Sequence, residues 1–279
     1  MIPLAAPTGT PDDDAYLVTI CQQNAWATPH QPPWLGAYAH YRTHLGNPWN
    51  VAPTVFSPDV GEKQYALYDT RRSGKRIQEI RDTPGLLCCP MCGSGMTGTL
   101  DHFLPRDKFP EFSLMLANLI PACSQCNSSG KRQVYRGDNP ESFIHPYFET
   151  LAISAIWQIE VLPPFGAATF RAFASNILPA PQKARVSFHL GKLLGKQFHL
   201  WAANRWSTLP QVIRNGLSGT GPITANQVQV ELTNQLGQHN VATGLNSWQS
   251  AFFRGLLNDA GAHAHIAALA TPLTATPPA

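Results

Sequence analysis

The pattern of apolar and polar positions separates an N-terminal region from a cysteine-rich one. Residues 1–82 begin with a stretch rich in Pro, Gly and Asp, pass through a segment rich in Trp and Tyr, and end in KQYALYDTRRSGKRIQEIRD. In that last segment tyrosines and basic residues recur every three or four positions, which predicts a helix that Ser73 and Gly74 weaken. We therefore expect a mostly helical region that leads the chain to the first cysteines.

Residues 151–279 show a strand pattern followed by helical patterns. The segment AIWQIEVLPPFGAATFRAFA reads as two short strands around Pro163-Pro164, a hairpin that could extend a small sheet. Further helices are expected near residues 224–238 and 245–258, and the ending TPLTATPPA is expected to be a disordered tail. Before them, apolar residues at helical spacing share one broad face and predict another helix: Val186, Leu190, Leu193, Leu194, Phe198 and Trp201.

Between these regions, residues 83–150 contain two CxxC pairs. Each CxxC turn can point two sulfurs at one tetrahedral ion, so the spacing is typical of a structural zinc site with four thiolates. Because we expect no signal peptide in the first residues, disulfides are the less favoured alternative. The expected zinc ligands are Cys89, Cys92, Cys123 and Cys126.

The two other cysteines have a different expected role. Cys88 could replace Cys89, but its separation from Cys92 is one residue longer than the usual turn. We expect Cys88 and the distant Cys21 to be small buried apolar residues.

The segment 89–131 joins the cysteine pairs to an Asp-His dipeptide, a middle Asn and an Asn directly after the last Cys. It resembles the HNH endonuclease family, whose ββα-metal site has Asp-His on a first strand, a middle Asn in a loop, and His or Asn on a helix. The resemblance covers roughly a sixth of the chain. It implies an α+β fold, in which a zinc-stapled, treble-clef-like ββα-metal module lies between mainly helical N- and C-terminal regions.

The resemblance also implies a role for each residue of the motif. Asp101 is expected to bind the catalytic metal and His102 to act as general base, since an imidazole with an ordinary pKa of about 6.5 is largely neutral at physiological pH. In a regular strand the two side chains point to opposite faces, so the strand end must twist if both serve one site. Asn127 either supplies an amide oxygen to Mg²⁺ or Mn²⁺ or only caps the helix. Asn118 is expected to hydrogen-bond backbone across the loop.

Three further residues are candidates for site support. Lys131 ends the pattern CNxxxK and is expected near a phosphate, whereas Arg106 either contacts phosphate or is a solvated loop residue. HPY segments recur in similar HNH proteins, so His145 either contributes to the site or is a half-buried histidine fixed before Pro146.

The overall charge does not indicate a nucleic-acid contact, but the local distribution of charge does. The net charge of +3 and a pI near 8.5 are only mildly basic, but no Asp or Glu occurs in residues 165–230, where seven Lys or Arg do. Phosphate contact needs such a surplus, although charge runs are usually only solvated faces. The candidate DNA contacts are Arg71, Arg72, Lys75 and Arg76 before the cysteines, and Arg185, Lys192 and Lys196 after them.

Composition limits the class of protein. A hydrophobic fraction of 43% supports a packed core, and no apolar segment is long enough to span a bilayer. We expect a cytoplasmic endonuclease with structural Zn²⁺ and catalytic Mg²⁺ or Mn²⁺, acting on DNA with RNA not excluded. A homodimer or a regulatory protein partner, and a role in restriction or antiphage defence, are further expectations. The alternative is a non-catalytic zinc module that binds nucleic acid or a protein partner.

Overall fold

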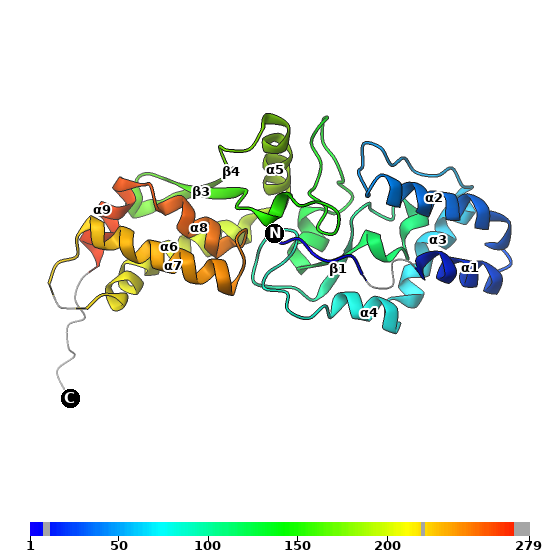
Figure 1. The fold of residues 1–279 in the computed structure, drawn as a ribbon, viewed down its shortest axis with the longest axis horizontal. Helices are drawn as coiled ribbons and strands as arrows, with labels where there is room; N and C mark the ends of the chain where they lie inside the picture. The colour runs from blue at the N-terminus through cyan, green and yellow to red at the C-terminus, as the bar shows by residue number, and fades with distance from the viewer. Residues whose placement is uncertain (8–11, 219–220, 271–279) are drawn as a thin grey trace.

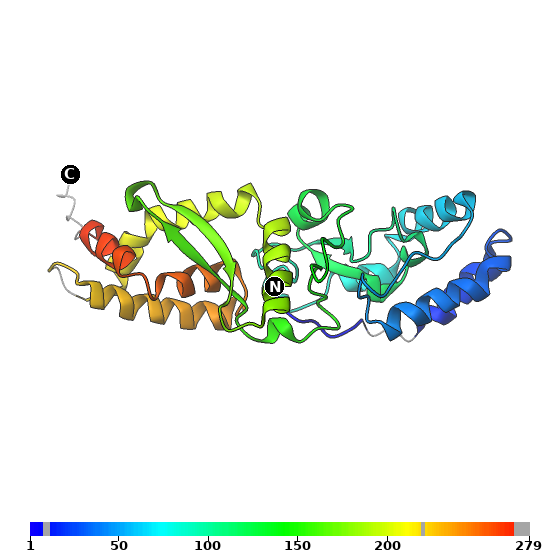
Figure 2. The same cartoon turned by 90° about the horizontal axis from the view of Figure 1, so that it is seen from above.

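The computed structural model describes residues 1–7, 12–218 and 221–270, and these form an elongated molecule with two lobes (Figures 1 and 2). The first lobe contains helices α1 to α4 and the small sheet β1–β2. The second contains the hairpin β3–β4 with α6 to α9 around it, and α5 lies where the lobes meet. Mixed helices and small sheets agree with the α+β class expected from the sequence. The division at residues 82 and 150 stays a prediction.

The N-terminal lobe begins with helices that local sequence signals start and stop. Prolines in the first turn of α2 and α3 suit helix starts, where the missing N–H would have no partner. The expected weakness at Ser73 and Gly74 is a break between α3 and α4. The bounds are α1 (Asp13–Gln23), α2 (Gln31–Thr43), α3 (Pro58–Arg71) and α4 (Lys75–Arg81).

A short antiparallel sheet carries the motif residues. Strand β1 (Thr99–His102) pairs with β2 (Leu119–Ala122), with Asp101 opposite Ile120 and His102 opposite Leu119. The chain then enters a helical segment that ends in the turn η5 (Cys126–Gly130), which contacts β1. Strand, strand and helical turn therefore follow the ββα order expected from the sequence.

The second lobe is built on a separate hairpin. Strand β3 (Trp157–Leu162) pairs with β4 (Thr169–Ala174) in its own two-stranded sheet, so the expectation that the hairpin extends the first sheet was wrong. Every second residue of β3 is buried, beginning with Trp157, and this strand packs against α8. The two strands of the hairpin pair only with each other among the described strands, and helices pack against them (Figure 2).

The helices of the second lobe differ from the expected ones in two places. The single helix expected across residues 185–201 is broken at Leu194 and Gly195, where the backbone is extended. Side-chain caps at Thr224, Ser247 and Asp259 start the last three helices, of which the third was not expected. The expected tail at 271–279 lies outside the described residues. The bounds are α5 (Ala180–Leu193), α6 (Lys196–Gly216), α7 (Ala225–Ala242), α8 (Trp248–Leu256) and α9 (Ala260–Leu269).

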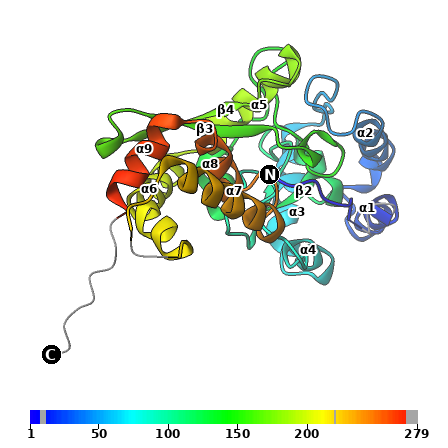
Figure 3. The same cartoon turned by 60° about the vertical axis from the view of Figure 1, so that its left-hand side comes forward.

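The two lobes meet at the first cysteine pair. Trp248 donates its indole N–H to the Cys92 carbonyl oxygen at 2.9 Å and its backbone N–H to the Gly93 carbonyl oxygen at 2.9 Å. Gly93 has φ +81°, and a Cβ there would lie 2.3 Å from the Asn246 carbonyl oxygen, so only glycine fits. The N-terminal segment also runs between the lobes, since the Met1 amine donates to the Asn246 carbonyl oxygen at 2.9 Å (Figure 3). The cysteine pair is thus enclosed by both lobes.

No helix in the described part of the chain is both long and apolar enough to cross a membrane.

Candidate metal centre and active site

The four cysteines of the two CxxC pairs form one buried cluster. Their sulfur atoms all lie within 4.8 Å of one another, with 4.0 Å between Cys89 and Cys126 and 3.7 Å between Cys92 and Cys123. A tetrahedral zinc ion with Zn–S bonds of about 2.3 Å separates its sulfurs by roughly 3.8 Å. The geometry therefore fits zinc, and the cluster could hold that ion.

Backbone amides also favour the thiolate form of this cluster. The Cys123 N–H points at the Cys89 sulfur at 3.3 Å, and the Cys126 N–H points at the Cys123 sulfur at 3.4 Å. A hydrogen bond from the Cys126 thiol lowers the pKa of the Cys123 thiol. Cys88 is buried outside the cluster, and burial raises the pKa of its thiol, so its environment is that of an apolar residue.

His102 ends β1 with its ring fixed on two sides. Its Nε2 lies 3.1 Å from the Ser113 carbonyl oxygen, and the Tyr68 ring of α3 meets the imidazole edge to face with centroids 4.6 Å apart. A carbonyl oxygen only accepts, so Nε2 carries the hydrogen and Nδ1 is the basic atom. Among the described residues Nδ1 has no hydrogen-bond partner. Burial lowers the pKa of His102 to about 3, which keeps the imidazole neutral at pH 7.

Asp101 points to a different neighbour. Lys131, fully buried, lies with its Nζ 3.2 Å from Asp101 Oδ2 and donates to the His102 carbonyl oxygen at 2.5 Å. Asp101 Oδ2 is buried and accepts no hydrogen bond of good geometry from any described residue. Burial raises the pKa of Asp101, and the Lys131 charge opposes that rise. A buried carboxylate oxygen of this kind fits a hard divalent ion as ligand.

Asn127 lies on the helical segment that packs against β1. It is half-buried within the π-helical turn Cys126–Gly130, and Lys131 directly follows that turn. Lys131 reaches Asp101 from there. No contact in the described part of the structure joins Asn127 to Asp101, so its role as a metal ligand stays a prediction.

Asn118 holds the loop between the two strands. Its Oδ1 accepts from the Leu104 N–H at 2.7 Å, and its Nδ2 donates to the carbonyl oxygens of Leu104 at 3.0 Å and Phe112 at 3.3 Å. These bonds join both ends of the loop that carries Ser113, which in turn accepts from His102. The bonds are those that the sequence analysis expected of a middle Asn.

Comparison with known proteins agrees with this geometry. The sequence model of the HNH endonuclease family matches residues 89–133. The chain contains an HNH endonuclease domain. Protein ea31 of Escherichia phage lambda is 48% identical over 62 residues, which are 22% of this chain and 21% of that protein, so the match spans about a fifth of either chain. No solved structure matches.

Two residues outside the matched segment brace the middle Asn of the HNH domain. Tyr41 of α2 donates its hydroxyl to Asn118 Oδ1 at 3.2 Å, and the same hydroxyl lies 3.1 Å from His145 Nε2. His145 Nδ1 accepts from the Tyr147 N–H at 3.2 Å, so Nε2 is the protonated atom and donates to Tyr41. Burial lowers the pKa of His145 to about 3. His145 therefore supports the HNH loop through Tyr41, which the sequence analysis did not single out.

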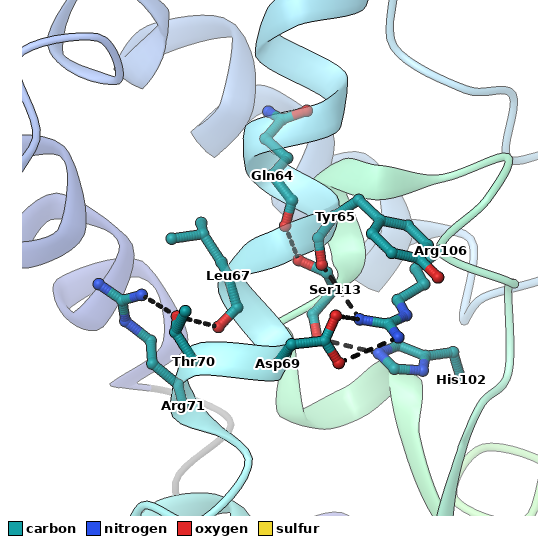
Figure 4. A network of polar contacts seen from close by, with 9 residues as sticks. All are labelled: Gln64, Tyr65, Leu67, Asp69, Thr70, Arg71, His102, Arg106 and Ser113. Carbon is teal, nitrogen blue, oxygen red and sulfur yellow. Dashed lines mark hydrogen bonds and ion pairs between the residues drawn. The ribbon is translucent and has the colours of Figure 1, made fainter.

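Arg106 lies beside His102 and is held by α3 (Figure 4). Its guanidinium forms two hydrogen bonds with the Asp69 carboxylate, at 3.0 and 3.2 Å, and a third with the Tyr65 carbonyl oxygen at 3.2 Å. It also stacks over the Tyr65 ring at 3.9 Å. Ser113 donates its hydroxyl to the Gln64 carbonyl oxygen at 2.6 Å. For this side of the site, the sequence indicated Arg106 and the tyrosines at helical spacing, but not Asp69.

The predicted DNA contacts fall into two groups. Lys192 and Lys196 are exposed and lie on either side of the break between α5 and α6. This break lies against η5 (Cys126–Gly130), which we call the HNH helix, since a Cβ on Gly130 would be 3.2 Å from the Lys192 carbonyl oxygen. Arg185 instead pairs with Glu149 through bonds of 2.6 and 2.7 Å.

The basic residues before the HNH domain are similarly divided. Arg76 pairs with the buried Asp13, whereas Arg72 is exposed, and Lys75 has 90% of its side chain exposed in a surface pair with Glu79 at 3.8 Å. Arg71 is half-buried and donates to Thr70 at 2.9 Å. Only part of this basic group is therefore free to meet a phosphate.

Proposed function

We propose that the protein is a metal-dependent endonuclease that hydrolyses phosphodiester bonds in DNA. One observation carries the proposal: within one HNH domain, a buried Asp101 oxygen that accepts no hydrogen bond of good geometry from any described residue directly precedes in the chain a His102 imidazole whose Nδ1 has no partner among the described residues. The first group suits a divalent ion and the second suits a water that is about to lose a proton.

In this proposal each motif residue has one task. His102 Nδ1 takes the proton from the attacking water, and the bond from Nε2 to Ser113 fixes the ring and stabilises the charge that the imidazole gains. Asp101 and Asn127 would hold Mg²⁺ or Mn²⁺, which when bound would neutralise charge at the phosphate and at the leaving oxygen. Asn118, braced by Tyr41, keeps the Ser113 loop in place.

Zinc has the structural role in the proposal. Four buried thiolates bind Zn²⁺ strongly enough to contribute folding energy. Because Trp248 donates to the Cys92 carbonyl oxygen, an ordered cysteine cluster would also fix the second lobe against the HNH domain.

Lys192 and Lys196 are the proposed phosphate contacts of the second lobe. Both are exposed, and both lie where α5 and α6 approach the HNH helix. We assign Arg185 a structural role instead, because its guanidinium also donates to Ser142 at 2.9 Å.

The alternative function, a zinc module without catalysis, also has an observation in its favour. Lys131 already neutralises Asp101, and only 9% of His102 is exposed. The two functions differ in their need for a divalent ion. Purified protein should therefore be incubated with plasmid, single-stranded DNA and RNA, with and without added Mg²⁺ or Mn²⁺. Cleavage that requires the added ion supports the nuclease, and binding without cleavage in either ion supports the alternative.

The biological setting is a further part of the proposal. We propose a cytoplasmic restriction or antiphage nuclease that works as a homodimer or with a regulatory protein, since one site of this kind cuts one strand. Plaque counts on cells that express the wild-type protein or His102→Ala would test it. Equal counts for a panel of phages would contradict this setting.

A further inference from the structure

Arg106 is a fixed cation at the side of the active site. Its side chain is only 19% exposed, its guanidinium stacks on the Tyr65 ring, and it donates to the Tyr65 carbonyl oxygen. The Tyr68 ring lies between α3 and His102, with the Arg106 guanidinium 5.1 Å from its centroid. The contacts of Arg106 with Tyr65 therefore do not depend on Asp69.

Asp69 is the movable half of this pair. Its side chain is 47% exposed at the last turns of α3, and its two oxygens meet the two terminal nitrogens of Arg106. A guanidinium binds a carboxylate and a phosphate with the same two-pronged geometry. Asp69 thus occupies the position in which Arg106 would hold a phosphate.

The Arg106–Asp69 pair lies beside the proposed general base (Figure 4). The charges of both Arg106 and Asp69 act on the His102 imidazole, in opposite directions. In Figure 4 the Arg106 guanidinium and the Asp69 carboxylate lie beside the His102 ring. A strand that presents one phosphate to water at His102 must bring a neighbouring phosphate past these two side chains.

We propose that Arg106 binds the backbone phosphate next to the scissile one, and that Asp69 fills this phosphate site until DNA displaces it. The inference rests on the proposed function, because it assumes a DNA strand at His102. DNA binding must break the ion pair between Asp69 and Arg106, so Asp69 lowers the affinity of the protein for DNA. Arg106 raises this affinity, because it contacts the phosphate.

The test compares two substitutions on the same helix that change charge equally. Asp69→Asn removes the competing carboxylate. The matched control is Asp59→Asn, because Asp59 belongs to an exposed pair with Lys63 at 2.7 Å on α3. Binding of a labelled duplex oligonucleotide is measured without added divalent ions, so that no cleavage occurs. Asp69 is a surface residue, so loss of folding does not obscure the comparison.

Asp69→Asn should bind the duplex about tenfold more tightly than wild type, as expected when one competing charge-assisted contact is removed. Asp59→Asn should stay within about twofold, since an exposed pair contributes little. Arg106→Gln should bind about tenfold more weakly. Weaker binding by Asp69→Asn would show that the pair only braces the site, and binding equal to that of Asp59→Asn would show that no phosphate meets Arg106; both overturn the inference. Wild-type protein that does not bind duplex DNA would overturn the proposed function as well, which separates the two failures.

Discussion

Lys131→Met removes the buried cation that neutralises Asp101. Lys131 is fully buried, and its ammonium group contacts the Asp101 carboxylate at 3.2 Å and the His102 carbonyl oxygen at 2.5 Å and lies over the Phe143 ring, 5.9 Å from its centroid. Removing it leaves the Asp101 carboxylate buried without a counter-charge, which typically costs about 3–5 kcal/mol. Protonation of Asp101, whose pKa burial already raises, would limit this cost. We therefore expect a loss of about 3 kcal/mol in the free energy of unfolding at pH 7.5.

The same variant reports on the proposed metal site. Without Lys131, a divalent ion is the cation that Asp101 needs, so Mg²⁺ should stabilise Lys131→Met more than wild type. At 10 mM Mg²⁺ and a Kd of about 1 mM, the gain is about 1.4 kcal/mol. The double variant with Asp101→Asn should lose this gain, because the carboxylate is then absent.

Urea unfolding with and without Mg²⁺ measures both effects, and Lys63→Met is the control for loss of an exposed lysine. A cost no larger than that of Lys63→Met would refute the buried ion pair. Equal stabilisation of the single and double variants by Mg²⁺ would refute Asp101 as the ligand.

Three further predictions concern the residues around the HNH domain. His189 accepts from the Ile144 N–H at 3.1 Å, and burial lowers its pKa to about 3. Neutral His189 therefore stabilises the folded protein above pH 6.5, and this stabilisation is lost as the pH falls below 6.5. In urea unfolding, the difference in free energy of unfolding between wild type and His189→Gln should narrow by about 1.4 kcal/mol from pH 7.5 to 5.5. A difference independent of pH would contradict this. Tyr41→Phe should cost about 1–3 kcal/mol, because the His145 N–H loses its acceptor, and should lower kcat with little change in KM for DNA; a change confined to KM would contradict the positioning role. Cys123→Ser should lose zinc by elemental analysis and fold poorly, and folded protein without zinc would exclude the structural role of the metal.

The HNH domain was predictable because its information is local. Two CxxC turns, a strand ending in Asp-His, and a middle Asn lie within one short segment, and each residue contacts partners from the same segment: Asn118 with Leu104, and Asp101 with Lys131. The four-cysteine cluster and the ββα order were therefore expected correctly. The choice of Cys89 over Cys88 also agrees with the cluster.

The parts that sequence reasoning missed depend on contacts between distant segments. Tyr41 and Asp69 reach the site from helices that lie outside the motif, and nothing in their local pattern indicates this role. The break at Gly195 was missed because the apolar spacing continues across it, although glycine is a poor helix former. The hairpin was found, but its separation from the first sheet depends on packing against α8, which periodicity does not encode.

If His102 is the general base of a nuclease that needs a divalent ion, plasmid cleavage must depend on both His102 and the ion. Wild type and His102→Ala, matched in zinc content and melting temperature, are incubated with supercoiled plasmid with and without Mg²⁺. We expect wild type to cleave only with the added ion, and His102→Ala to cleave at a rate about 10²- to 10⁴-fold lower. Cleavage by His102→Ala at the wild-type rate would contradict it.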